Sequence, residues 1–226
     1  MIDVVRNRLR LHFSPGGADS GDSLAADSAP VHDRSLPEVE FVAYADDCRL
    51  FGHLRLSGDR LTDMLNEYEE YILVDVLAES LLDGSEAETI EIVVTRDELL
   101  AVEATGPRGS GDRRLRTQQH PMALKAGPYL VQGYLHAQLG LDPLMTIRRR
   151  GPMVPLTSAL IAYTSGGVRG VHEATTLLVN RERTDWIAPV GDEERAFPDV
   201  PVLLEHGSLL AEFPEIASPE WALEPG

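Results

Sequence analysis

Cysteine, aromatic residues and long apolar stretches are all scarce in this sequence, and each scarcity excludes a class of protein. Cys48 is the single cysteine, which excludes an intramolecular disulfide framework and a zinc cluster built on cysteines. Aromatic residues make up only 6% of the 226 residues, so the core must be aliphatic. No run approaches the roughly 18 apolar residues of a membrane helix, and the opening residues lack the apolar segment of a signal peptide. We therefore expect a soluble, cytoplasmic protein without a membrane span.

Basic residues and recognisable catalytic motifs are also in short supply. The chain has 20 basic against 37 acidic residues, a net charge of -17, which argues against general affinity for nucleic acid. Nucleophile elbows, phosphate-binding glycine loops and HExxH motifs are absent. The seven histidines are scattered without the spacing of metal ligands. His172 beside Glu173 is the one candidate acid–base pair, and it lacks a third member to orient it. We predict a protein that is not an enzyme and that needs no cofactor or metal.

Composition divides the chain into six segments. Apolar residues concentrate in two of them, and the others are rich in Gly, Ser, Pro or charge, as is typical of linkers and tails. The predicted segments are a basic and apolar N-terminal stretch (1–13), a flexible linker (14–38), an acidic β repeat (39–105), an Arg- and Gly-containing linker (106–118), a basic β repeat (119–190) and an acidic, Pro-containing tail (191–226).

The two apolar segments share a pattern that predicts an internal repeat. Each contains an apolar stretch with one internal glycine, Gly52 in the first and Gly133 in the second. Each also contains an apolar run that ends at an arginine, Arg96 or Arg181. The shift in numbering between the copies grows from 81 through 82 to 85, so only short insertions separate them. The matched stretches are residues 49–56 with 129–137, 71–81 with 153–163, and 92–102 with 177–187.

Within each copy the apolar residues mostly alternate with polar ones, which predicts β-strands. A strand, a turn at Asp46 and Asp47, and a second strand account for residues 39–56. The glycine inside the second strand predicts a bulge or a sharp bend, by which a short sheet curls into a barrel. Residues 60–71 predict a short helix capped by Thr62 or Asp63, and Pro143 interrupts its counterpart in the second copy. The fold class we expect is mainly β, with two tandem small β-barrel or β-sheet repeats and minor helix.

The bent strand around Gly52, followed by the apolar strand that ends at Arg96, resembles the two signature segments of Sm-like small barrels. The resemblance implies a barrel-like fold over most of each copy. In that family a glycine follows the arginine, whereas Asp97 and Glu182 occupy the corresponding positions of this chain. The family's RNA-contacting residues, an Asp–Asn pair and the Arg-Gly loop, are not reproduced. The tandem pattern is also similar to bacterial domains of unknown function.

Charge differs in sign between the two copies. Residues 39–107 hold 4 basic and 17 acidic residues, a net of -13, while residues 108–190 hold 11 basic and 5 acidic ones, a net of +6. The tail from residue 191 has a net charge of -8, from 1 basic and 9 acidic residues. Opposite charges favour specific pairing of the copies within a chain or head-to-tail between chains. Diverged surface charge that serves solubility explains the same numbers.

Two arginine clusters are the candidate binding residues for an anionic partner or for the acidic tail. The cluster before the second copy is Arg113, Arg114 and Arg116, and the cluster inside it is Arg148, Arg149 and Arg150. Gly52, Arg96, Gly133 and Arg181 are assigned a structural role as the repeat signature.

We conclude from the sequence that the chain is a non-catalytic, bacterial-type adaptor or assembly protein. It would act through protein–protein contacts, either with another protein or by self-association through its oppositely charged repeats. The alternative is an Sm-like nucleic-acid-binding module that uses Arg148–Arg150, against which the net acidity counts.

Overall fold

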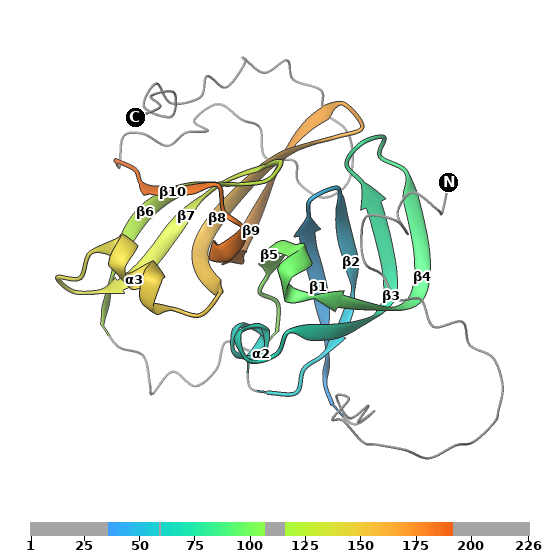
Figure 1. Cartoon of the computed structure of the whole chain (residues 1–226), viewed down its shortest axis with the longest axis horizontal. Coiled ribbons are helices and arrows are strands. Elements are labelled where there is room, and N and C mark those ends of the chain that lie inside the picture. Colours follow the sequence, from blue (N-terminus) through green and yellow to red (C-terminus); the bar gives the residue numbers. More distant parts are fainter. Residues whose placement is uncertain (1–35, 59, 107–115, 192–226) are drawn as a thin grey trace.

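The computed structural model describes residues 36–58, 60–106 and 116–191 (Figure 1). Ten strands and two short helices account for most of these residues. The predictions for residues 1–13, for the linker up to residue 35, for residues 107–115 and for the tail from residue 192 lie outside the described residues.

We call residues 38–103 the first half and residues 117–189 the second half. The elements of the first half are β1 (Glu38–Ala45), β2 (Cys48–Arg55), α2 (Leu61–Glu67), β3 (Glu70–Ser80), β4 (Glu86–Thr95), the 3-10 turn η1 (Arg96–Glu98) and β5 (Leu99–Glu103). Those of the second half are β6 (Thr117–Ala126), β7 (Tyr129–Gln138), α3 (Pro143–Arg149), β8 (Met153–Ser165), β9 (Val168–Asn180), η3 (Arg181–Arg183) and β10 (Trp186–Pro189). The predicted strand, turn and strand over residues 39–56 is confirmed by β1 and β2.

All ten strands belong to one antiparallel sheet, in the order β10-β6-β7-β8-β9-β5-β1-β2-β3-β4. The mainly β class is therefore confirmed. The prediction of barrels is wrong, because the sheet is not closed. Within the first half β4 and β5 do not pair; β5 instead pairs with β9 of the second half, so the sheet continues from one half into the other (Figure 1).

The strand registers of the two halves correspond position by position. Phe41 pairs with Gly52 across β1 and β2, and the equivalent Met122 pairs with Gly133 across β6 and β7. The remaining strands correspond too. Adding 83 to a residue number in β3 gives the equivalent residue in β8, and adding 85 to one in β4 or β5 gives the equivalent residue in β9 or β10; the equivalent residues have equivalent partners. Each half thus has the same internal strand order, β5-β1-β2-β3-β4 or β10-β6-β7-β8-β9.

A bulge bends each half at its glycine. The register shifts between Phe51 and His53 against β3, and between Gln132 and Tyr134 against β8. Asp75, opposite Gly52, and Ser158, opposite Gly133, both have left-handed backbone conformations, with φ of 51° and 48°. A Cβ on Gly52 would lie 2.9 Å from a backbone oxygen of β3, so only glycine fits there without a shift of the strand. The irregularity predicted at the glycine is present, but the extra residue of the bulge lies in the facing strand: Asp75 and Val76 of β3 together oppose Gly52.

Two short helices cross from the second to the third strand of each half. In α2, Leu61 and Leu65 are buried, as the spacing of apolar residues predicts. The predicted caps are wrong, because Arg60 is the N-cap residue and makes no side-chain cap hydrogen bond. Asp63 instead accepts hydrogen bonds from the Arg60 guanidinium at 2.8 and 3.1 Å.

The helix α3 begins at Pro143, where the sequence pattern indicated an interruption. Proline suits the first turn of a helix, where its missing N–H would have no intrahelical partner. Asp142 caps the helix by accepting a hydrogen bond from the backbone N–H of Met145 at 2.9 Å.

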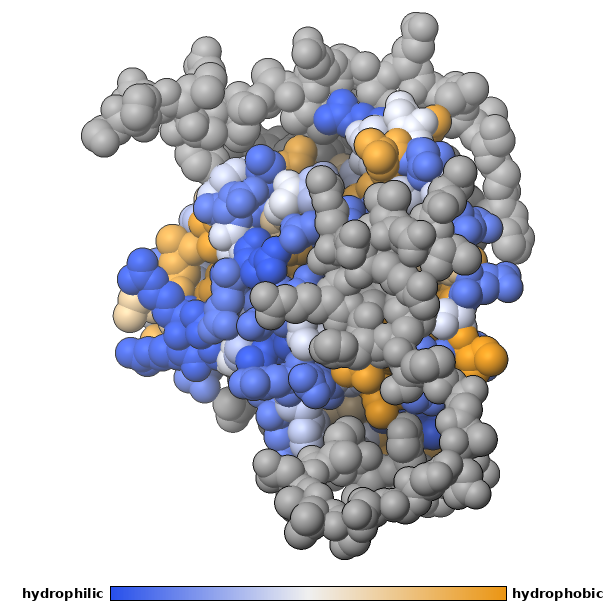
Figure 2. All heavy atoms as spheres, turned by 45° about the vertical axis from the view of Figure 1, so that its right-hand side comes forward, coloured by the Kyte–Doolittle hydropathy of each residue, from blue (hydrophilic) through white to orange (hydrophobic). Residues whose placement is uncertain are grey.

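Aliphatic side chains form two main core clusters, one for each half. Each cluster also includes side chains from the other half. Met153 and Leu178 of the second half lie in the first cluster, and Tyr44, Leu100 and Ala101 of the first half lie in the second. The surface is different in kind: Figure 2 shows one face on which hydrophilic side chains predominate, interrupted by smaller hydrophobic groups.

Candidate functional site

The most distinctive contact of the described chain is the pairing of β5 with β9, which we call the inner joint. Three residue pairs form it: Ala101 with Val179, Val102 with Leu178, and Glu103 with Leu177. Beyond them, the backbone N–H of Ala104 donates to the Thr176 carbonyl at 2.9 Å. Val102 and Leu178 are both 0% exposed. The inner joint is therefore a buried, antiparallel contact between the last strand of one half and the fourth strand of the other.

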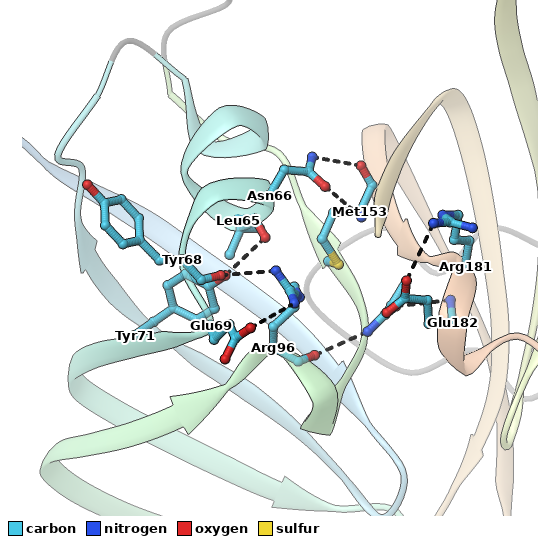
Figure 3. Close-up of polar contacts among 10 residues, drawn as sticks. Leu65, Asn66, Tyr68, Glu69, Tyr71, Arg96, Met153, Arg181 and Glu182 are labelled. Atoms are coloured by element: carbon cyan, nitrogen blue, oxygen red, sulfur yellow. Dashed lines mark hydrogen bonds and ion pairs between the residues drawn. The ribbon is translucent and has the colours of Figure 1, made fainter. Parts of the chain in front are cut away.

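Asn66 of α2 extends the inner joint beyond the strands. Its side chain pairs with the backbone of Met153 at the start of β8, donating to the carbonyl at 3.0 Å and accepting from the N–H at 2.9 Å (Figure 3). A side-chain amide has both donor and acceptor groups and so replaces a strand partner for this residue. Gly151 lies so close to Asn66 that a Cβ there would overlap it.

Asn180, at the end of β9, is a second amide at the inner joint. It is 0% exposed and donates to the carbonyls of Arg96 and Leu99 at 3.2 and 3.0 Å. Its oxygen accepts from the N–H of Glu182 at 3.1 Å. The residue thus satisfies backbone groups of both 3-10 turns, as buried polar groups require.

Arg96 and Arg181 make the same contacts in their own halves. The N–H of Arg96 donates to the Glu69 carbonyl at 2.7 Å, and that of Arg181 donates to the Pro152 carbonyl at 2.9 Å. Each guanidinium also donates to the carbonyl one residue earlier, both at 3.3 Å. These arginines therefore tie each 3-10 turn to the segment that follows the helix, as Figure 3 shows for Arg96.

Partly buried polar groups cross the inner joint around Glu103. The Tyr44 hydroxyl donates to the Glu103 carboxylate at 2.7 Å, and His172 Nε2 lies 3.0 Å from the same oxygen. Burial, followed by the charge of Glu103, raises the pKa of Tyr44. The acid–base pair considered from the sequence is not formed as expected, because His172 contacts Glu103, while Glu173 is the next residue of the strand and points to the opposite face.

Arg49 makes a second set of contacts across the halves. Its guanidinium lies 4.7 Å from the ring centre of Tyr163 and 5.0 Å from that of Phe51, and it donates to the Tyr163 hydroxyl and to Glu79. Ser165 donates to the same carboxylate of Glu79 at 2.8 Å. The two halves are thus joined by polar contacts as well as by strand pairing.

The two end strands of the sheet, β4 and β10, each have one neighbour among the described strands. We call their other sides the outer edges. Unpaired edges can accept a further strand, and proteins often protect them with charge or proline. On β4, Ile90 is 82% exposed, and on β10, Pro189 is exposed. In the strand order of its half, β4 holds the position of β9, and β10 holds the position of β5.

An exposed acidic loop joins the end of α2 to the start of β3 and lies next to the end of β4, where Glu70 pairs with Thr95. We use this name for residues 67–70, which are Glu67, Tyr68, Glu69 and Glu70, all of them exposed. The Glu69 side chain is 84% exposed and lies 3.9 Å from the Arg96 guanidinium. A pair with so exposed a carboxylate contributes little, so the loop keeps much of its negative field.

The predicted cluster Arg148, Arg149 and Arg150 lies at the end of α3. Arg148 and Arg149 are exposed in the last turn. Arg150 differs, because its guanidinium turns inward to donate to the His136 carbonyl, and burial lowers its pKa. Only two of the three arginines therefore present their charge at the surface.

The other predicted cluster is described in part. Arg116 is exposed just before β6, whereas Arg113 and Arg114 lie outside the described residues. Binding of an anionic partner by these arginines stays a prediction.

A pocket of about 290 Å³ opens on the second half, over β6 to β9 and the residues after β10. Its walls include Met122, Leu160 and Val190, with Gln132 and Glu173 as polar members. Gln132 is 8% exposed, and its amide nitrogen has no hydrogen-bond partner in the described part of the chain. The pocket is thus mainly apolar, with one buried donor and one carboxylate.

Cys48 fills a core position. It is 3% exposed, and burial raises the pKa of its thiol to about 12. A buried thiol with a raised pKa behaves as a small apolar side chain rather than as a reactive thiolate. His136 is partly buried on β7 and contacts Thr117 and Thr157, at 3.2 and 2.9 Å, and burial and Arg150 lower its pKa.

Within residues 36–58, 60–106 and 116–191, three or more His, Cys, Asp or Glu residues do not come together in a group that could hold a metal ion. The helices described in these ranges fall short of the length and apolar character needed to cross a membrane. Comparisons with protein-family models, with curated proteins and with solved structures each find no match. The resemblance to Sm-like barrels accordingly stays a prediction.

The residues that hold the inner joint are not among those predicted from the sequence. Asn66, Asn180 and Glu103 belong to no motif, and their contacts reach residues far along the chain or across a turn. The matching positions of Arg96 and Arg181 were the available signal. The Arg96 carbonyl accepts a hydrogen bond from Asn180, and Arg181 holds the Gly151–Pro152 segment that lies against Asn66.

Proposed function

We propose that this chain is a non-catalytic assembly protein that joins head-to-tail with further copies of itself. In this proposal the two halves are diverged copies of one five-stranded unit. The observation that carries the proposal is the inner joint: within the chain, the fourth strand of the second half pairs with the fifth strand of the first. The outer edges β4 and β10 are the corresponding two strands, and each lacks that partner among the described residues.

The inner joint supplies a register for the contact between chains, which we call the outer joint. At the inner joint Val102 of β5 pairs with Leu178 of β9. Adding 85 to the β5 residue gives Ile187 of β10, and subtracting 85 from the β9 residue gives Val93 of β4, so Ile187 should pair with Val93 of the next copy. The neighbouring pairs become Trp186 with Val94, and Ala188 with Ile92 of the next copy. Antiparallel pairing of this kind adds a strand to an exposed sheet edge through backbone hydrogen bonds.

Differences in burial support the proposal. Val102 and Leu178 are fully buried at the inner joint, whereas Val93 and Ile187 are only half-buried in the single chain. A second copy would cover these two side chains, and burial of apolar area contributes roughly 25 cal/mol per Å².

The outer joint would have one backbone hydrogen bond fewer than the inner joint. Pro189 occupies the position of Ala104, whose N–H donates to Thr176, and proline has no N–H. Because the contact uses two different surfaces, it repeats from copy to copy and produces a ring or a filament rather than a closed dimer.

A disulfide cross-link tests the proposed register. Val93→Cys combined with Ile187→Cys should give a ladder of covalent multimers after oxidation, seen on a non-reducing gel, because facing residues of antiparallel strands are within disulfide range. The buried Cys48 should not contribute.

Glu88→Cys with Ile187→Cys is the matched control. Position 88 is on the same strand but about 17 Å from position 93, at about 3.4 Å per residue. A ladder from both pairs would reject the register. Monomers from both pairs, together with a monomeric mass by light scattering, would reject the proposed function.

A further inference from the structure

The inner joint contains a contact between a helix and a loop as well as paired strands, and the outer joint should contain its equivalent. At the inner joint, Asn66 in the last turn of α2 meets the residues from Gly151 to Met153 that lead into β8. Subtracting 83, the shift that relates β3 to β8, places the equivalent segment of the first half at 68–70. The two helices begin at Leu61 and Pro143, so the position in α3 equivalent to Asn66 is Arg148.

We infer that Arg148 and Arg149 bind the acidic loop, residues 67–70, of the next copy. This inference rests on the proposed function and names the residues that give the assembly its specificity. The neutral contact of an asparagine with a glycine loop at the inner joint is replaced at the outer joint by arginines that face Glu69 and Glu70.

The charges of the two surfaces support this pairing. Both arginines are exposed in the last turn of α3, and Glu67, Glu69 and Glu70 are exposed in the acidic loop. The half that carries the loop has a net charge of -13 over residues 39–107, and the half that carries the arginines is positive. Such an arrangement steers two copies into the head-to-tail orientation and opposes pairing of like halves.

The aromatic residue of the loop adds a second point of recognition. Tyr68, which is 43% exposed, occupies the position of Gly151. An arginine above an exposed tyrosine ring gains a cation–π contact in addition to its ion pairs. The inner joint has no room for such a side chain, since a Cβ at Gly151 would already overlap Asn66. The two joints are therefore chemically different, and the outer one is sensitive to salt.

Charge reversal of the two surfaces, followed by mixing, tests the inference on the full chain. The basic variant is Glu69→Arg with Glu70→Arg, and the acidic variant is Arg148→Glu with Arg149→Glu. Each variant alone should weaken assembly by about 10- to 100-fold, because two ion pairs become repulsive contacts. An equimolar mixture should restore assembly with the two variants alternating, because each unlike contact pairs opposite charges: the reversed surfaces face each other at one joint, and the unmodified surfaces face each other at the next.

Arg55→Glu with Arg169→Glu is the matched control for the acidic variant. It makes the same change in net charge on β2 and β9, which have neighbours on both sides, and should leave the mass unchanged. Mass is measured by light scattering over a range of concentrations, at low and high salt.

The failures of the two proposals are distinguishable. An unmodified chain that assembles and forms the 93–187 cross-link, but whose assembly survives either reversal, would overturn this inference alone. An unmodified chain that is monomeric at every concentration would overturn the proposed function with it. Equal weakening by the control variant would show a net-charge effect and also reject the arginine contact.

Discussion

Individual side chains in this protein act mainly by satisfying backbone groups that the fold leaves without partners. Asn66 pairs with both polar groups of Met153, and Asn180 serves two carbonyls and one N–H. Each replaces a backbone partner at a place where strands end and turns begin. Neither has a sequence signature, because most of the groups that they serve lie far away along the chain.

Asn180→Ala should lower the free energy of unfolding by about 2 to 4 kcal/mol. Three hydrogen bonds are lost, and the buried carbonyls of Arg96 and Leu99 each lose the donor that Asn180 supplies. Chemical denaturation measures the change. Ser85→Ala, which removes exposed hydroxyl contacts only, is the control and should change stability by less than about 0.5 kcal/mol. Equal effects of the two substitutions would contradict the role of Asn180.

At the scale of single elements, a glycine decides how each half bends. Gly52 and Gly133 were identified from their place within alternating apolar residues, and both coincide with a shift of register. The helix at Leu61–Glu67 was also predictable from the spacing of Leu61 and Leu65. The start of α3 was not, because proline at a first turn and proline that breaks a helix look alike until the neighbouring cap is known.

Gly52→Ala should destabilise the chain by about 1 to 3 kcal/mol. The added Cβ would lie 2.9 Å from the Val74 carbonyl oxygen, which is backbone and can move only with its strand. Gly58→Ala is the matched control, because a Cβ there meets nothing within 4 Å. Thermal unfolding of both variants checks the prediction, which fails if Gly52→Ala melts at or above the temperature of the control.

At the scale of the whole molecule, the two halves share tyrosines at their contact. Tyr44, Tyr129 and Tyr163 have ring centres 5.3 to 6.2 Å apart and come from β1, β7 and β8. Burial raises the pKa of each, and it raises the pKa of Tyr71 to about 12. Burial at the contact between the halves therefore favours the protonated, neutral form of these tyrosines.

Alkaline pH should destabilise the fold. In the unfolded chain a tyrosine loses its proton near pH 10, whereas the pKa of Tyr71 in the folded chain is about 12. Above about pH 10 the unfolded state binds fewer protons, so the free energy of unfolding falls as pH rises to about 12. Phenolate absorbance should show that fewer than all six tyrosines titrate near pH 10 while circular dichroism reports a folded chain. Titration of all six near pH 10 without unfolding would contradict this.

The β class, the first hairpin around Asp46 and Asp47, the glycines at the two register shifts and the first helix could all be predicted from the sequence. These features depend on near neighbours in the chain, where alternation, glycine and turn residues act directly. Three features became visible only in the folded chain: β5 pairs with β9 of the other half, the sheet stays open, and Arg150 turns inward while Arg148 and Arg149 stay at the surface. Those outcomes depend on which edge finds which partner. Pairings between residues of different halves are set by packing and burial, which local spacing does not record.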